Sequence, residues 1–146
     1  MILRFIIGDI MKKIRVAFAT DDGKTFIGRH FGDSNFYDIY EFDENQANFI
    51  ERIDNTVDEK EEVHADPKKA KGIAKLLMDE NVKVVVSKIF GPNIKRIRKK
   101  FVCIVVNDDS LEDSMNRICK NIRIVMDEWE KGEKRKHLTF RKKTDL

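Results

Sequence analysis

Residues 82–106, VKVVVSKIFGPNIKRIRKKFVCIVV, decide the fold class of this 146-residue chain. The runs at 82–87 and 101–106 are short, apolar and rich in β-branched side chains, which is typical of strands buried on both faces. Between them, Gly91-Pro92-Asn93 opens a short helix whose isoleucines face inward. A strand–helix–strand unit requires parallel pairing with a right-handed crossover. The stretch therefore predicts a parallel α/β core.

Further elements extend this core towards both ends of the chain. Three more stretches have the composition and bounding turns of strands, at residues 14–20, 36–42 and 48–54. The link between the last two has the length of a hairpin, so we expect those strands to pair antiparallel. Asp66-Pro67 opens an amphipathic helix, because Asp caps free N–H groups and Pro suits the first helical position.

A longer helix is expected from Leu111 to about Lys131, with Ser110 and Asp113 forming a capping box at its start. Its apolar residues repeat at spacings of four and three, which indicates either a core face or a seam for a partner. These residues are Leu111, Met115, Ile118, Ile122, Val125 and Trp129. The seam leaves a homodimer through this helix open. The whole element order predicts a three-layer α/β/α domain, with one mixed sheet of about five strands covered by three helices.

Charge is distributed unevenly along the chain. The formal net charge is +3, but residues 131–146 hold seven Lys or Arg and two acids, so residues 1–130 carry a net charge of −2. A body so close to neutral argues against nucleic acid as its main partner. We therefore expect an N-terminal extension at 1–12, one domain at 13–131 and a basic tail at 132–146.

The start of the chain and its cysteines bear on the cellular compartment. No apolar run reaches the roughly 18 residues of a membrane-spanning helix. Arg4 and Asp9 interrupt the apolar start and no small-residue cleavage site follows, so we do not interpret it as a signal peptide. Met11 leaves a second start of translation open. Two cysteines, Cys103 and Cys119, are too few for a disulfide scaffold, and the cytoplasm is the expected compartment.

Polar residues gather where the parallel strands are expected to end, and ligands of such sheets bind outside those carboxyl ends. Asp21-Asp22-Gly23 follows the first strand, Lys88 and Gly91 follow the fourth, and Asn107-Asp108-Asp109 follows the fifth. One function open to this edge is a metal-dependent nuclease, in which these four aspartates hold two Mg²⁺ ions. Against it, the first strand has no interior acid.

The loop at 28–32, Gly-Arg-His-Phe-Gly, is expected to fold over the same edge of the sheet. Its His30, together with His64 ahead of the first long helix, is a candidate metal ligand, because imidazole binds transition metals. A lone loop histidine is more often solvated than ligating. Cys103 lies inside an apolar strand and is expected to be inert core, so thiolate ligation is not expected.

Three motifs follow one another in a distinctive order: VAFATDDGK at 16–24, HFG at 30–32 and FYDIY at 36–40. This order resembles the dinitrogenase iron–molybdenum cofactor-binding family, the nitrogenase accessory proteins and their relatives. Later pieces fit in the same order, namely His64, a helix at 69–77, VVV at 84–86 and GPN at 91–93. The resemblance covers about residues 13–131, and His-Phe-Gly in this setting is a fairly specific part of it.

The resemblance implies a ribonuclease H-like α/β/α fold and a non-catalytic protein that carries an iron–molybdenum or other metal–sulfur cluster, or its precursor. It implies that His30 contacts the cluster, with His64 as a second metal ligand. The other implied contacts are the loop residues Gly28, Arg29, Phe31 and Gly32, with Lys88 and Gly91 from the end of the fourth strand. Of these, Lys88 or Arg29 would balance the charge of an anionic cluster. A protein that donates or accepts the cluster would be the partner. The remaining alternative is an interaction module without a cluster, which binds a protein or an anionic surface through the seam and the tail.

Overall fold

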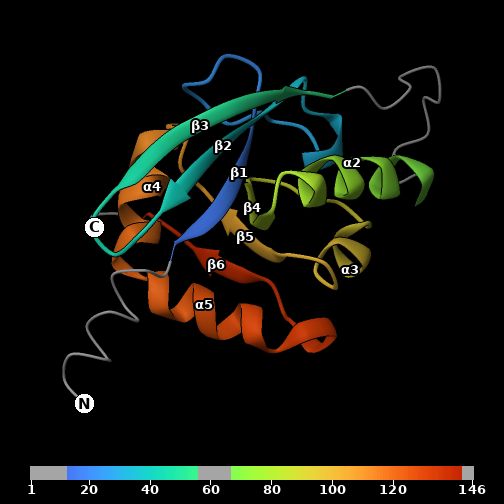
Figure 1. Ribbon diagram of the computed structural model, residues 1–146. Coiled ribbons are helices and arrows are strands. Elements are labelled where there is room, and N and C mark those ends of the chain that lie inside the picture. The colour runs from blue at the N-terminus through green and yellow to red at the C-terminus, as the bar shows by residue number, and fades with distance from the viewer. Residues whose placement is uncertain (1–12, 56–66, 143–146) are drawn as a thin grey trace.

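The computed structural model describes residues 13–55 and 67–142, and it confirms the three-layer α/β/α class (Figure 1). Its elements are β1 (Ile14–Thr20), η1 (Phe31–Asp33), β2 (Phe36–Phe42), β3 (Ala47–Asp54), α2 (Pro67–Asp79), β4 (Val82–Ser87), α3 (Ile94–Ile97), β5 (Val102–Val106), α4 (Leu111–Lys120), α5 (Ile122–Glu130), η2 (Gly132–Lys134) and β6 (Leu138–Phe140). The expected positions of His64, of the Asp66 cap and of residues 1–12 lie outside the described residues.

One mixed sheet forms the middle layer, with the strand order β3-β2-β1-β4-β5-β6. The central strand β1 pairs antiparallel with β2 and parallel with β4, so the direction of pairing changes at β1. The β2–β3 hairpin is antiparallel, whereas β4, β5 and β6 are parallel. The carboxyl ends of β1, β4, β5 and β6 therefore share one edge of the sheet, which we call the carboxyl edge.

The two faces of the sheet bury separate apolar clusters, because successive side chains of a strand point to opposite sides. One face packs Val16, Phe18 and Val84 against α4 and α5. The other face packs Ala17 and Val85 against η1, α2 and α3. Figure 1 shows α2 and α3 on one side of the sheet and α4 and α5 on the other. The strands that carry the loops of the carboxyl edge are thus packed on both faces by an apolar core.

The long helix expected from Leu111 is two helices, because the chain bends at Asn121. The backbone of Asn121 is not helical (φ −116°, ψ 22°), and its side-chain amide donates to the Arg117 carbonyl at 2.8 Å. Periodic spacing continues through this bend, which is why the sequence pattern does not detect it. The expected seam belongs to the core, since Ile118, Ile122 and Val125 are buried against the sheet. It therefore gives no support to a homodimer.

The segment expected to be a basic tail is folded onto the domain over its described part. Leu138–Phe140 forms β6, a sixth strand that pairs parallel with β5. Ahead of it the Arg135 side chain is buried, and it donates two hydrogen bonds to the Trp129 carbonyl at 3.0 and 2.8 Å. The Arg135 guanidinium also lies 4.1 Å from the centre of the Trp129 ring. Neither β6 nor this contact was expected from the sequence.

Two smaller expectations are confirmed. Ser110 caps α4, since its hydroxyl accepts a hydrogen bond from the Asp113 N–H at 3.3 Å. Cys103 is fully buried, and burial raises the pKa of its thiol far above the ordinary range. None of the helices in the described parts of the chain is long and apolar enough to cross a membrane.

Candidate functional site

The loop that follows β1 crosses the carboxyl edge and holds His30 against the end of β4. His30 forms an isolated parallel bridge with Ile89, and the Phe31 N–H donates to the Ile89 carbonyl at 2.8 Å. The His30 backbone is extended (φ −61°, ψ 146°) and directly precedes η1. The sequence expectation that the first loop and the end of the fourth strand meet is therefore confirmed by backbone contacts.

Gly91 forms the surface on which the His30 imidazole rests. A Cβ atom added at Gly91 would lie 2.6 Å from His30 Nδ1, 2.8 Å from Cε1 and 2.9 Å from Cγ. Gly91 also has a positive φ of +74°, a conformation that residues with a side chain rarely adopt. Only glycine satisfies both conditions, so residue 91 fixes where the imidazole lies. The sequence pattern identified both residues but not this contact.

A hollow opens beside His30, between η1, α2 and α3. Its cavity volume is only about 20 Å³, and the space reaches about 450 Å³ when the part open to solvent is included. It is lined by His30, Phe31, Gly32, Asp33, Ile73, Ala74, Phe90, Asn93, Ile97 and Phe101. Phe31 and Phe90 form its aromatic wall, with ring centres 5.2 Å apart and planes inclined by 23°. The hollow thus combines an apolar wall with one imidazole, one carboxylate and one amide at its polar side.

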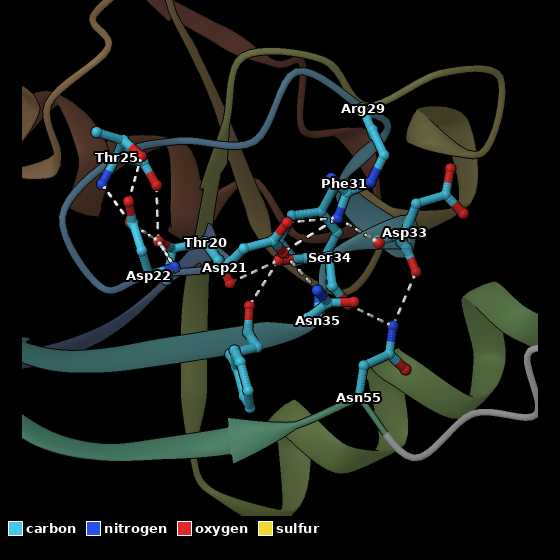
Figure 2. A network of polar contacts seen from close by, with 12 residues as sticks. Thr20, Asp21, Asp22, Thr25, Arg29, Phe31, Asp33, Ser34, Asn35 and Asn55 are labelled. Atoms are coloured by element: carbon cyan, nitrogen blue, oxygen red, sulfur yellow. Dashed lines mark hydrogen bonds and ion pairs between the residues drawn. The ribbon is translucent and has the colours of Figure 1, made fainter.

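A network of polar contacts braces the histidine loop (Figure 2). Asp21 accepts from Arg29 Nη2 at 3.0 and 2.9 Å and from the Asn35 N–H at 3.0 Å. Arg29 also donates to the Asp33 carbonyl at 3.1 Å. From the end of β3, the Asn55 side chain donates to the carbonyls of Gly32 and Ser34 at 3.0 and 2.8 Å. The loop is therefore tied both to β1 and to β3.

A buried tyrosine, Tyr37, holds Phe31 in position. The Tyr37 hydroxyl donates to the Phe31 carbonyl at 2.8 Å, and the two ring centres are 4.9 Å apart. Burial raises the pKa of Tyr37 well above its usual 10.0, so this phenol stays protonated and keeps donating. Phe31, which the sequence placed in the site, is therefore held in position as part of the aromatic wall of the hollow.

Asp22 stabilises the turn that starts the loop. Its carboxylate accepts from the N–H groups of Lys24 and Thr25, both at 2.8 Å, and from the Thr25 hydroxyl at 2.9 Å. These hydrogen bonds to the charged form lower the pKa of Asp22 far below its ordinary value. Asp22 is therefore a turn residue, and its carboxylate is directed to backbone rather than to the hollow.

The other residues expected in the site have distinct surroundings. Gly28 is exposed, and a Cβ atom there would meet nothing within 4 Å. Gly32 lines the hollow, 3.4 Å from Ile73 when a Cβ atom is added. Lys88 forms an ion pair with Asp109 and does not line the hollow. His64 lies outside the described residues.

The four aspartates that could have formed a two-metal nuclease site are used elsewhere. Asp21 pairs with Arg29, Asp22 caps its turn, and Asp109 pairs with Lys88. Asp108 forms a buried ion pair with Arg117 of α4, and none of the residues that the structure describes hydrogen-bonds its Oδ1. Within residues 13–55 and 67–142, no three His, Cys, Asp or Glu side chains are grouped as a metal site.

Several residues of the site were not identified from the sequence. Phe90 and the α2 residues Ile73 and Ala74 line the hollow, and Asn55 braces the loop from β3. Phe90 precedes Gly91 directly, and Asn55 follows the strand that ends at the carboxyl edge, so their positions in sequence were the available signal. Their contacts depend on the packing of α2 and β3, which local patterns do not specify.

Comparisons with known proteins identify the family of the chain and relate its fold to solved structures. The profile of the family described as "Dinitrogenase iron-molybdenum cofactor" matches residues 12–121. A crystal structure of a presumed dinitrogenase from Methanocaldococcus jannaschii has a TM-score of 0.53 at 21% identity, covering 76% of this chain and 92% of that chain. Its NMR structure has a TM-score of 0.54 at 21% identity, covering 77% and 92%. At this identity the likeness shows the fold alone. No curated protein matches the sequence significantly.

Proposed function

The chain belongs to the dinitrogenase iron–molybdenum cofactor family, and from that premise we propose that it binds and carries a metal–sulfur cluster or its precursor. We propose that the cargo is of the iron–molybdenum or iron–sulfur type and that the protein catalyses no reaction. The observation that carries the proposal is the His30 imidazole, held on Gly91 at the rim of an apolar hollow. The cluster is cargo here, so its release matters as much as its binding.

A single imidazole suits a carrier. Neutral imidazole binds iron and molybdenum, and one protein–metal bond is easier to exchange than the several thiolate bonds of a resident cluster. Cys103 is buried, and neither it nor Cys119 lines the hollow, so neither thiol is placed to compete with His30. The Phe31–Phe90 wall excludes water from one side of the cargo, and Gly32 leaves its backbone accessible to the cluster's sulfides.

The counter-charge for an anionic cluster would come from α3 rather than from the residues expected from the sequence. Arg29 and Lys88 are already paired with carboxylates, so we propose that they position the loop and the end of β4. On α3, Lys95 and Arg96 are exposed, while the neighbouring Asn93 and Ile97 line the hollow. These two cations would give the rim a positive potential, and no carboxylate of residues 13–55 and 67–142 forms an ion pair with either of them.

Anaerobic reconstitution tests the proposal. Wild-type protein, His30→Ala and His137→Ala are incubated with an iron–sulfur or molybdenum–sulfur cluster, desalted and analysed for iron, molybdenum and sulfide. His137 is the matched control, because it is an exposed histidine just ahead of β6, far along the chain from the loop. We expect retention by wild type and His137→Ala, and loss in His30→Ala. Equal retention in all three proteins would show that His30 does not hold the cluster.

The remaining assignments follow from this proposal. His64, expected as a second ligand, is tested in the same experiment by His64→Ala. The partner would be a protein that donates or accepts the cluster, and the compartment would be the cytoplasm. A nuclease is the weaker alternative, because the four aspartates it would need are engaged with cations and backbone. A cleavage assay with Mg²⁺ or Mn²⁺ is expected to give no product.

A further inference from the structure

Two basic stretches far apart in the sequence lie side by side in the structure. The first is 95–100, with the sequence KRIRKK, which carries five cations and no acid. The second is 131–136, with the sequence KGEKRK, which carries four cations and one acid. Figure 1 shows the end of α5, where the second stretch begins, next to α3. The second stretch belongs to the segment that was expected to be a basic tail.

Arg135 is the residue that joins them. Its guanidinium donates to the carbonyl of Lys99 at 3.0 Å and to the carbonyl of Trp129 at 3.0 and 2.8 Å. The Arg135 side chain is therefore used internally, and the stretch 131–136 is tied to the C-terminal end of the first stretch. The cations that remain outward are exposed, namely Lys95, Arg96, Lys99, Lys100, Lys134 and Lys136. We call these six residues the basic surface.

The basic surface adjoins the proposed cargo site. Asn93 and Ile97 line the hollow, whereas Lys95 and Arg96 on the same short helix face solvent. A molecule that covers the outer side of α3 would therefore lie at the rim of the hollow that holds His30. Charged surfaces of this kind steer oppositely charged partners and orient them before contact.

We propose that the basic surface is the docking surface for an acidic protein that exchanges cargo with the His30 hollow, an inference that rests on the proposed function. A protein fits better than a nucleic acid for two reasons. Glu133 is exposed within the second stretch and Glu130 is exposed directly before it, and both repel phosphates but can pair with cations of a protein partner. The body outside the C-terminal segment is slightly acidic, whereas nucleic-acid interfaces are strongly positive.

The test uses the full chain without cargo and fluorescent poly-L-glutamate as the probe, with double-stranded DNA as the comparison. The patch variant is Lys99→Glu with Lys100→Glu, and the matched control is Lys24→Glu with Lys120→Glu, all four residues being exposed. Both variants change the net charge equally. Reversing two surface charges is expected to weaken poly-glutamate binding about tenfold in the patch variant and little in the control.

A third variant, Arg135→Lys, keeps the charge but loses the forked hydrogen bonds that join the two stretches. We expect its affinity for poly-L-glutamate to fall between those of wild type and the patch variant. Equal loss in the patch and control variants would overturn the proposal, because binding would then follow net charge alone. Tighter binding of DNA than of poly-glutamate, abolished by the same substitutions, would overturn it in favour of a nucleic-acid surface.

The outcome is separable from that of the proposed function. Reconstitution of the Lys99→Glu, Lys100→Glu protein is expected to retain the cluster as wild type does, since neither side chain lines the hollow. The patch variant could lose poly-glutamate binding while His30→Ala still retains the cluster. That result would support the basic surface as a docking surface and refute His30 as the cargo site. Unchanged poly-glutamate binding in the patch variant would refute the surface whatever the cluster does.

Discussion

Replacing Gly91 by alanine should disable the His30 site while leaving the histidine in the chain. The added Cβ would lie 2.6 Å from His30 Nδ1, whereas non-bonded contacts are about 3.5 Å or longer. The imidazole must therefore move by about 1 Å. Metal–ligand distances tolerate only about 0.2 Å. We expect Gly91→Ala to lose cluster retention nearly as completely as His30→Ala.

The same substitution has a cost in stability that can be divided into two parts. Alanine in the left-handed conformation costs roughly 1–2 kcal/mol, and the contact with the imidazole adds about 1–3 kcal/mol. Gly132 has a similar φ of +62°, but a Cβ atom there meets nothing within 4 Å. Gly132→Ala therefore measures the cost of the left-handed conformation alone. Gly28→Ala, at an open position, is the control that should leave stability unchanged.

Thermal unfolding and cluster retention measured on the three variants check the reasoning. Each kcal/mol lowers Tm by about 2–4 °C in a chain of this size. Gly132→Ala is expected to lower Tm by about 2–8 °C with retention intact, and Gly91→Ala to lower it further. If Gly91→Ala retained the cluster, or cost no more than Gly132→Ala, the glycine would not position the imidazole.

Three further predictions concern the scaffold of the site. Asp22→Ala should lower the free energy of unfolding at neutral pH. Because hydrogen bonds hold the pKa of Asp22 below its ordinary 3.8, the difference in unfolding free energy between wild type and variant, measured by urea unfolding, should shrink as pH falls below 3.8. Arg117→Met leaves the buried Asp108 carboxylate unpaired and should cost about 3–5 kcal/mol in chemical denaturation, much of it restored by adding Asp108→Asn. Tyr37→Phe removes the hydrogen bond to the Phe31 carbonyl and should cost about 1–2 kcal/mol. In the wild type, burial raises the pKa of Tyr37, so its phenolate absorbance should appear only on unfolding, and stability should fall as pH rises above 10.

Local patterns predicted the strands well because each strand's own composition marks it. The apolar runs of β1, β4 and β5 and the composition of β2 place each strand within a residue or two of its observed bounds. β6 escaped prediction because it has only three residues in a basic stretch, and its pairing with β5 is its main support. The bend at Asn121 escaped because apolar spacing runs through it unbroken.

The candidate site was predicted as a set of loops rather than as a set of contacts. Parallel topology brings the ends of β1 and β4 together, so His30 and Gly91 could be placed at one edge from the sequence. The same reasoning did not show that Arg29 and Lys88 are paired with carboxylates. Those pairings, like the Phe31–Phe90 stack, depend on side-chain directions that only the packed structure determines.

The tryptophan beside Arg135 gives this protein an internal optical reporter. The chain contains one tryptophan, and its ring centre lies 4.1 Å from the Arg135 guanidinium and 5.3 Å from the Lys83 ammonium. Release of the segment that carries β6 would remove one of these cations and expose the indole to water. Fluorescence emission excited at the tryptophan band should therefore follow the attachment of the C-terminal segment in the unlabelled protein.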